Sequence, residues 1–268
     1  MKVGILGNAA KVKSQTTIDE IVTFVQNCGY ETVRFTSPLD VAGVDVVIVL
    51  GGDGAILHSA VTAARNGVKI IGINYGNLGF LAEYEKDERE KVKELLKQIE
   101  NGSCRILKRS LLQCEIAGKV FYALNEITVQ RDYSLSSVKM PQILRLEVDT
   151  QEGKTLVSGD GMLICTPTGS TAYSLSAGGA ILTPEVPVFM MTPICAFSMR
   201  TRPIVVSDTD EFSIFVKKGR AIVLADGLSL AGLPENARIS IKKAPFTADF
   251  PQRENSDFFE KVKNKISE

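Results

Sequence analysis

Hydrophobic residues in the first hundred positions follow two alternating patterns. Short, continuous apolar runs predict strands that are buried on both faces of a sheet. These runs cover residues 3–6, 32–35, 45–50 and 68–73. Between them, apolar residues recur every three or four positions, which predicts helices with one buried face. These helices cover residues 16–28, 55–65 and 87–100. The alternation predicts a parallel, right-handed α/β sheet of the Rossmann-like kind.

The pattern changes after Gly102. Short β-rich runs are separated there by turn signals, and only a short helix after Gly169 is expected before residue 250. Residues 255–266 look helical again, and we expect a common apolar side made of Phe258, Phe259, Val262 and Ile266. We therefore predict an α/β domain over residues 1–100 and a mostly β domain over 101–250. The C-terminal helix is expected to return to the first domain, which residues 251–268 complete.

The composition excludes several classes of protein. The 31 basic and 31 acidic residues cancel, so the overall charge favours neither nucleic acid nor an anionic membrane. The apolar runs are too short or too interrupted to span a membrane. Five cysteines without a CxxC pair and a single histidine argue against a disulfide framework and a structural zinc site. We expect a cytoplasmic protein with reduced thiols and with neither a nucleic-acid nor a membrane partner.

A glycine-rich turn joins the strand at 45–50 to the next helix. Its sequence is Gly51-Gly52-Asp53-Gly54. Backbone N–H groups at such a helix start bind phosphate, and glycine lets the phosphate oxygens approach. A carboxylate would repel phosphate, so Asp53 is better explained by action on a hydroxyl or a metal beside it. The alternative is a tight strand-to-helix connection with Asp53 as the helix N-cap.

Three further segments could carry chemistry. The loop at 74–80 follows the next strand and is expected at the same sheet edge as Asp53, although a plain connecting loop explains it equally well. Asn125-Glu126 interrupts an apolar stretch and could bind a ribose or a base, but an exposed strand face is the favoured interpretation. Asp226-Gly227 alone indicates a hairpin turn. His58, on the helix after Asp53, is more simply an exposed helix residue.

The strongest signal is the stretch 158–179, where a strand leads into a turn rich in hydroxyls and glycine. Ser and Thr hydroxyls at a helix start can bind phosphate or ribose without adding charge, and Tyr173 could stack on a base. A capped helix explains one of these hydroxyls but not the cluster.

In order and spacing, these segments resemble the NAD kinase family. The run Thr166-Pro-Thr-Gly-Ser-Thr-Ala-Tyr173 is specific to that family, whereas the glycine turn is shared with phosphofructokinases and lipid kinases. The resemblance implies transfer of the γ-phosphoryl of ATP, or of another donor such as polyphosphate, to the 2′-hydroxyl of the adenosine ribose of NAD. It also implies Mg²⁺ or another divalent metal as cofactor. A homodimer or homotetramer with its sites near the subunit interface is implied as well, with residues 194–196 at that junction.

The resemblance also assigns roles to residues. Asp53 is implied as the proton acceptor, and Gly51, Gly52 and Gly54 as the loop that holds the phosphate donor. The implied NAD-binding residues are Gly54, His58, Asn125, Glu126, Asp160, Thr168, Thr171, Ala172, Tyr173 and Ser176. No metal ligands are implied.

Two alternatives to an NAD kinase stay open. A lipid or sphingoid kinase would share the glycine turn, and a non-catalytic sensor would bind NAD without turnover. A dehydrogenase is not expected, because the first strand is not followed by G-x-G-x-x-G.

Overall fold

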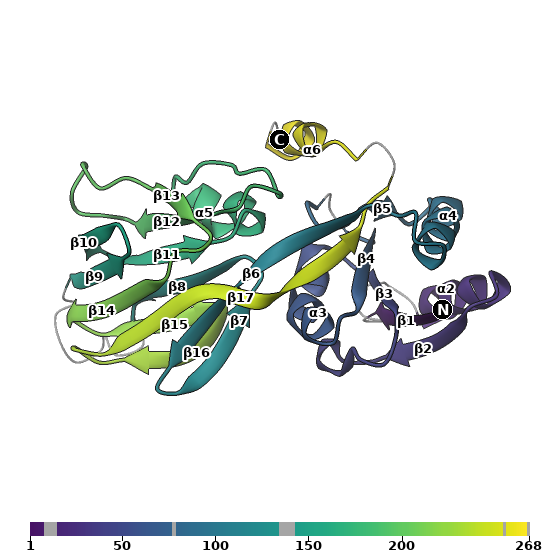
Figure 1. Ribbon diagram of the computed structural model, residues 1–268, viewed down its shortest axis with the longest axis horizontal. Coiled ribbons are helices and arrows are strands. Elements are labelled where there is room, and N and C mark those ends of the chain that lie inside the picture. The colour runs from purple at the N-terminus through teal and green to yellow at the C-terminus, as the bar shows by residue number, and fades with distance from the viewer. Residues whose placement is uncertain (8–14, 77–78, 134–142, 254–255, 267–268) are drawn as a thin grey trace. The chain divides into compact units, whose positions relative to one another are not determined.

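The computed structural model describes residues 1–7, 15–76, 79–133, 143–253 and 256–266 (Figure 1). The chain divides into two compact units. Unit 1 comprises Met1–Lys108 and Phe246–Glu268, and unit 2 comprises Arg109–Pro245.

Unit 1 contains a five-stranded parallel sheet in the order β2-β1-β3-β4-β5. Its strands are β1 (Lys2–Gly7), β2 (Glu31–Phe35), β3 (Val46–Leu50), β4 (Lys69–Asn74) and β5 (Tyr84–Glu85). Its helices are α2 (Gln15–Asn27), η1 (Pro38–Asp40), α3 (Asp53–Arg65), α4 (Arg89–Glu100) and α6 (Phe258–Ile266). Every residue of β3 is buried, as its unbroken apolar run predicts. The predicted parallel α/β sheet is confirmed.

The helices of unit 1 follow their apolar stripes. α2 buries Ile18, Ile21, Val22 and Val25, which join side chains of β1 and β3 in one core. In α6, the prediction that Phe258 and Phe259 share one side is wrong. Phe259 is 72% exposed, because successive residues of a helix point about 100° apart.

Unit 2 is built from two six-stranded sheets. One has the order β10-β9-β14-β17-β6-β7, and the other β13-β12-β11-β8-β15-β16. The strands are β6 (Ile106–Ile116), β7 (Lys119–Ala123), β8 (Glu126–Arg131), β9 (Leu144–Thr150), β10 (Gly153–Gly159), β11 (Gly161–Cys165), β12 (Val188–Ile194), β13 (Ile204–Ser207), β14 (Phe212–Lys218), β15 (Ala221–Ala225), β16 (Leu228–Leu233) and β17 (Arg238–Pro251). The short helices η2 (Thr168–Thr171) and α5 (Tyr173–Ser176) follow β11.

Side chains from both sheets meet in one large buried core. Val148 of β9, Ile164 of β11 and Phe212 of β14 all belong to it. The mostly β character and the short helix after Gly169 agree with the predictions. Strands β6 and β17 both run across the boundary between the units, at residues 108–109 and 245–246.

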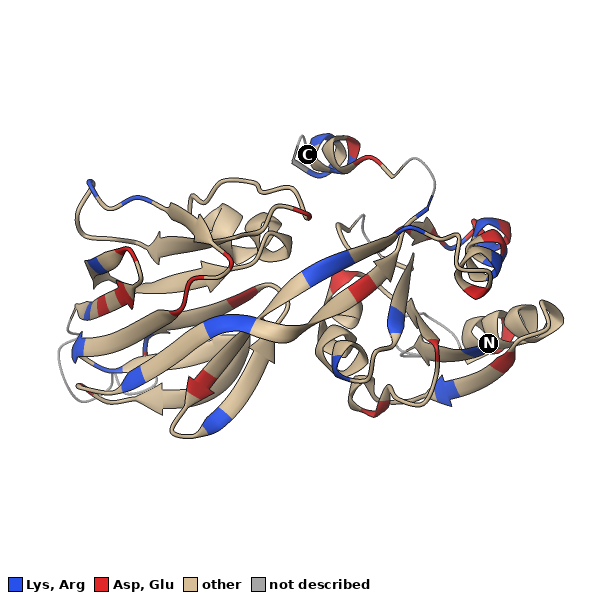
Figure 2. Cartoon of the chain, viewed as in Figure 1, with Lys and Arg blue, Asp and Glu red and all other residues tan. Residues whose placement is uncertain are grey.

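Charged side chains of both signs are mixed along the surface helices. Figure 2 shows Lys and Arg next to Asp and Glu on α4 and on α6. On α4, Arg89 pairs with Glu20 of α2 at 2.8 Å. No helix in the described ranges is long and apolar enough to cross a membrane.

Candidate active site

Asp53 stands at the start of α3, but its side chain does not cap that helix. Gly52 is the N-cap residue, and no side chain makes the capping bond. The Asp53 carboxylate turns instead to the loop after β4. Oδ2 accepts a hydrogen bond from the backbone N–H of Phe80 at 2.7 Å, and Oδ1 accepts one from that of Leu81 at 3.0 Å. The structure therefore replaces the N-cap interpretation with a carboxylate held by the neighbouring loop.

Gly79 makes this contact possible. A Cβ atom at this position would lie 2.6 Å from Asp53 Cγ, and closer still to Oδ1. Only a glycine lets the loop approach the carboxylate so closely. The loop therefore lies at the same sheet edge as Asp53, as predicted from the parallel order of β3 and β4. Phe80 and Leu81 are buried beneath it, whereas residues 77–78 of the predicted loop lie outside the described ranges.

Among the described residues, the glycines of the turn leave space in front of α3. Cβ atoms at Gly52 and Gly54 would meet none of these residues within 4 Å. α3 is 13 residues long, so its first N–H groups and its dipole favour an anion here. Gly51 differs, because a Cβ there would lie 2.8 Å from that of Ala55. His58 lies further along the same helix and is exposed, as its simpler interpretation predicts.

In unit 2, Asp226 organises the Asn125-Glu126 segment. Oδ1 accepts hydrogen bonds from the backbone N–H groups of Asn125 at 2.8 Å and Glu126 at 3.1 Å, and Oδ2 accepts one from that of Leu124 at 2.8 Å. Asp226 and Gly227 both have positive φ, at 48° and 79°, and connect β15 to β16 as the predicted hairpin turn. The turn therefore has a second role that its sequence does not reveal.

Glu126 is buried rather than placed on an exposed strand face, so that expectation is wrong. Its exposed fraction is 6%, and Oε2 has no hydrogen-bond partner among the described residues. Burial, and secondarily the charge of Asp226, raise the pKa of Glu126 to about 8. At neutral pH the carboxyl is therefore mostly protonated, and it can donate a hydrogen bond as well as accept one.

The turn after β11 packs against the same segment. Thr166 Oγ1 donates to the carbonyl oxygen of Leu124 at 2.6 Å, and the N–H of Thr166 donates to that of Asn125 at 2.9 Å. A Cβ at Gly169 would lie 2.5 Å from the carbonyl carbon of Asn125, so this approach also needs glycine. Three predicted segments, at 125–126, 166–171 and 226–227, therefore meet in unit 2.

The hydroxyls of this turn face mainly into the protein. Ser170 Oγ donates to the carbonyl oxygen of Pro167 at 2.7 Å, and the buried Ser174 and Thr192 hydroxyls share a hydrogen bond of 2.8 Å. Thr168 is 7% exposed, and its Oγ1 accepts a hydrogen bond from Arg109 Nη1 at 3.1 Å. Much of the hydroxyl cluster therefore holds the turn in shape.

The remaining predicted NAD-binding residues of unit 2 lie on this turn or close to it. Thr171 and Ala172 are half-buried, Ser176 is exposed, and Tyr173 is 39% exposed. Burial raises the pKa of Tyr173, and the nearby Cys195 and Asp160 add to the increase. Asp160 forms an ion pair of 2.8 Å with Arg131, whose guanidinium lies over the ring of Tyr133.

Three charged residues that contact the predicted site residues could not be identified from the sequence. Arg109 holds Thr168, Arg131 holds Asp160, and Lys265 Nζ lies 3.4 Å from Asp53 Oδ2. None belongs to a local motif, and each contacts its partner only through the tertiary fold.

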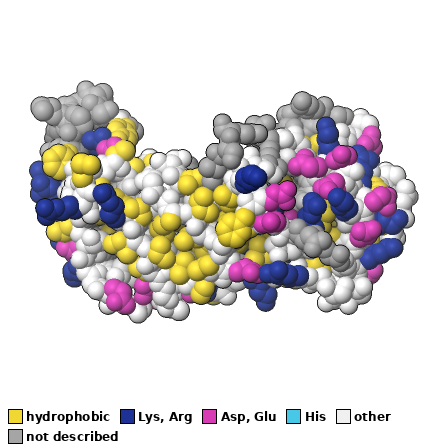
Figure 3. All heavy atoms as spheres, turned by 90° about the horizontal axis from the view of Figure 1, so that it is seen from above, with side chains coloured by type: hydrophobic (Ala, Val, Ile, Leu, Met, Phe, Trp, Pro, Cys, Tyr) yellow, Lys and Arg dark blue, Asp and Glu magenta, His cyan; other side chains and the backbone are white. Residues whose placement is uncertain are grey.

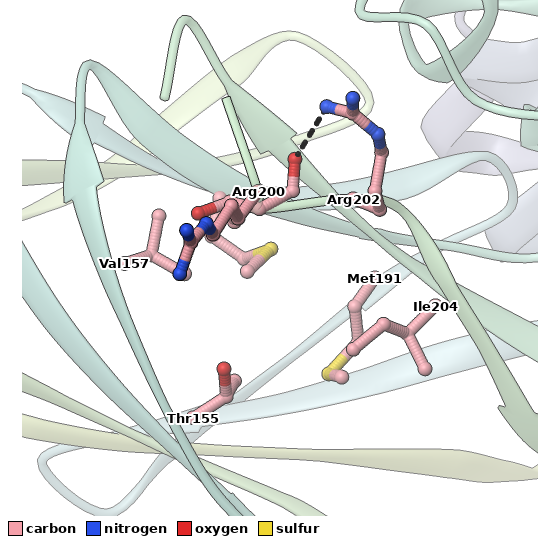
Figure 4. Close-up of a pocket in the computed structure, with 8 residues that line it drawn as sticks. Thr155, Val157, Met191, Arg200, Arg202 and Ile204 are labelled. Atoms are coloured by element: carbon pink, nitrogen blue, oxygen red, sulfur yellow. Dashed lines mark hydrogen bonds between the residues drawn. The ribbon is translucent and has the colours of Figure 1, made fainter. Parts of the chain in front are cut away.

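A pocket of about 280 Å³ lies elsewhere in unit 2 (Figure 4). Its lining comprises Thr155, Val157, Met162, Met191, Arg200, Thr201, Arg202 and Ile204. It contains none of the residues that the sequence assigns to the site.

Comparison with known proteins gives one consistent family. A family model described as the ATP-NAD kinase N-terminal domain matches residues 6–104, and one described as the ATP-NAD kinase C-terminal domain matches 124–252. An NAD kinase of Carboxydothermus hydrogenoformans is 37% identical over 84% of this chain and 80% of its own length. One of Caldicellulosiruptor saccharolyticus is 31% identical over the full length of both chains.

Solved structures agree in fold. The yeast NADH kinase complexed with NADH superposes with a TM-score of 0.84 at 22% identity, covering 100% of this chain and 87% of that one. An NAD kinase from Archaeoglobus fulgidus in complex with ATP gives 0.79 at 25% identity, covering 100% and 98%. The fold is thus that of the kinases that act on NAD or NADH. Since the two family models together match most of its length, this chain belongs to the ATP-NAD kinase family.

Proposed function

We propose that this chain is an NAD kinase, which transfers the γ-phosphoryl of ATP to the 2′-hydroxyl of the adenosine ribose of NAD. The observation that carries the proposal is the Asp53 carboxylate, fixed beside an open glycine turn at the start of α3. Its family membership favours this activity over a lipid kinase or a non-catalytic sensor.

Within the described ranges, the hydrogen bonds to Asp53 leave one acceptor position to spare. A carboxylate offers about four lone-pair sites. Oδ2 receives Phe80 N–H and the Lys265 ammonium, and among the described residues Oδ1 receives only Leu81 N–H. We propose that the remaining site on Oδ1 accepts a hydrogen bond from the 2′-hydroxyl.

The chemical step depends more on the position of the Asp53 carboxylate than on its basicity. The 2′-oxygen forms a bond to the γ-phosphorus, the bond from that phosphorus to the bridging oxygen breaks, and ADP leaves with the electron pair. The hydroxyl proton passes to Asp53 Oδ1. Because the transition state of phosphoryl transfer is loose, this proton can move late, so a weak base suffices. Alignment can supply roughly 7–11 kcal/mol of the barrier.

The phosphate donor is proposed to lie at the N–H groups of Gly52 and Gly54. Mg²⁺ is proposed as part of the Mg·ATP substrate, since this ion binds mainly through phosphates and one or two carboxylates. The described ranges fit that mode, because they contain no group of three His, Cys, Asp or Glu side chains that could hold a metal alone. When bound, the ion neutralises phosphate charge.

The dinucleotide is proposed to bind in unit 2 at the three segments that Asp226 and Thr166 hold together. Asn125 and the protonated Glu126 offer hydrogen-bond donors and acceptors to a ribose or amide group. Tyr173 offers an exposed ring for stacking. The outer residues Asp160, Thr171, Ala172 and Ser176 complete the proposed NAD site.

We further propose a homodimer or homotetramer that forms through the apolar surface of unit 2. Phe197 is 79% exposed, Met199 is 83% exposed, and Ile204 and Val205 are almost half exposed. Figure 3 shows hydrophobic side chains gathered over the β-rich unit on the face that is drawn there. Surfaces rich in Phe, Met and Arg are typical of protein interfaces. Light scattering should give a multiple of the chain mass, and the double variant Phe197→Asp, Met199→Asp should give a smaller one. A wild-type monomer contradicts the proposal.

Five free cysteines, of which Cys114 and Cys165 are buried, support the proposed cytoplasmic location.

One experiment tests the activity. Purified protein is incubated with NAD, Mg²⁺ and either ATP, another triphosphate or polyphosphate, and NADP is measured. NADP formation supports the proposal and identifies the donor. Binding of NAD without turnover would indicate a sensor, and phosphorylation of a lipid instead of NAD would indicate the other kinase class.

A further inference from the structure

The C-terminal helix α6 places a lysine against the Asp53 carboxylate. Lys265 Nζ lies 3.4 Å from Asp53 Oδ2 and 4.4 Å from the centroid of the Phe80 ring. Phe80 therefore holds both members of the pair: its N–H binds the carboxylate and its ring binds the ammonium. The Lys265 side chain is 35% exposed and that of Asp53 is 30% exposed, so the pair is partly open to solvent.

The rest of α6 is anchored so that this lysine is aimed at Asp53. Lys261, one turn before Lys265, pairs with Glu83 at 2.7 Å, and Ser256 Oγ donates to the same carboxylate at 3.1 Å. The Phe258 ring lies 6.4 Å from that of Phe80. Residues four positions apart share one face of a helix, so Lys261 and Lys265 contact the segment 79–85 together. The contacts fix the helix at both ends of this face.

A cation beside Asp53 would assist the proposed reaction. The glycine turn carries no lysine of its own, unlike a P-loop, where a lysine reaches the phosphates. A γ-phosphate beside Asp53 would bring two anions together, and their repulsion opposes the attack of the hydroxyl. An ammonium within hydrogen-bond reach of the carboxylate lowers this repulsion.

We propose that Lys265 is a positioning residue that holds the Asp53 carboxylate and counters the charge of the transferred phosphoryl group. This inference rests on the proposed NAD kinase activity. It assigns to the C-terminal helix a direct part in the phosphoryl-transfer step, beyond its packing on unit 1.

The test compares three variants by the initial rate of NADP formation. Lys265→Met keeps the apolar stem and removes the charge, Lys265→Arg keeps the charge, and Lys263→Met removes an exposed charge from the same helix. We expect Lys265→Met to lower kcat about 10- to 100-fold with the KM for NAD changed less than about threefold. Lys265→Arg should recover most of kcat, and Lys263→Met should stay within about twofold of the wild type.

The thermal midpoint of each variant separates a lost charge from a detached helix. A lower kcat in Lys265→Met with an unchanged midpoint and recovery in Lys265→Arg supports the inference. A normal kcat in Lys265→Met overturns it, and so does an equal loss in Lys265→Arg and Lys265→Met, because a purely structural role is not restored by charge. In both cases a wild type that makes NADP leaves the proposed function intact. A wild type that makes none overturns the proposed function, and this inference with it.

Discussion

The buried Glu126 carboxyl makes the stability of unit 2 depend on pH. Its pKa is raised from 4.5 to about 8 in the folded protein, chiefly by burial. In the unfolded chain it returns to its ordinary value. Between these two pKa values the folded state binds one proton more than the unfolded state, so the free energy of unfolding falls as pH rises. At about 1.36 kcal/mol per pKa unit, the loss between pH 5 and pH 8 is about 3–4 kcal/mol.

The variant Glu126→Gln removes this titration while it keeps the size of the side chain. Urea unfolding of the wild type and the variant is measured at pH 5, 6, 7 and 8 and at one protein concentration. Relative to that of the wild type, the free energy of unfolding of the variant should rise by about 3–4 kcal/mol between pH 5 and pH 8. Glu115→Gln, the same substitution at an exposed position of β6, serves as the matched control.

The result that refutes this reasoning is a difference between Glu126→Gln and the wild type that stays constant across the pH range. Glu126 would then be ionised or solvated in the folded protein. This result would also refute the hydrogen-bonding role proposed for the protonated form of Glu126.

Two further predictions concern the contacts around Asp53 in unit 1 and around Asp226 in unit 2. Gly79→Ala should turn the Asp53 carboxylate away from Phe80 and Leu81, which lowers kcat at least about 100-fold while the fold stays intact, because the displaced atoms end a flexible side chain. Gly76→Ala, whose Cβ would meet only one atom of the described residues, Asn74 Oδ1 at 3.9 Å, is its control, and equal activities in NADP assays would contradict the role given to Gly79. Asp226→Asn should lower the free energy of unfolding by about 1–3 kcal/mol, because the amide group faces backbone N–H donors that the carboxylate now satisfies. An unchanged urea midpoint would show that these bonds do not stabilise the segment.

The features that could be predicted from the sequence are those that local patterns determine. The unbroken apolar run of β3 and the glycines after it are enough to predict a strand, a turn and a helix. The parallel order of β3 and β4 then places the loop at 79–81 beside Asp53, although the pattern does not say that its N–H groups bind the carboxylate. The stripe of α2 predicts its buried residues for the same reason.

The features that could not be predicted depend on contacts between distant residues. The exposed-strand interpretation of Glu126 fails because Asp226, 100 residues away, holds its backbone, while the surrounding strands bury its side chain. Lys265 reaches Asp53 across 212 positions of sequence. The hydroxyls after β11 show the same limit. Their number suggests a ligand site, but Thr166 and Ser170 use their hydroxyls to hold the turn itself.

The most direct test of the account is the variant Asp53→Asn. The amide keeps the size of the side chain but cannot accept the proton of the 2′-hydroxyl, so NADP formation with NAD, Mg²⁺ and the active donor should fall to background while calorimetry still shows NAD binding. Near-normal turnover in this variant would contradict the role of Asp53, on which the proposed mechanism depends.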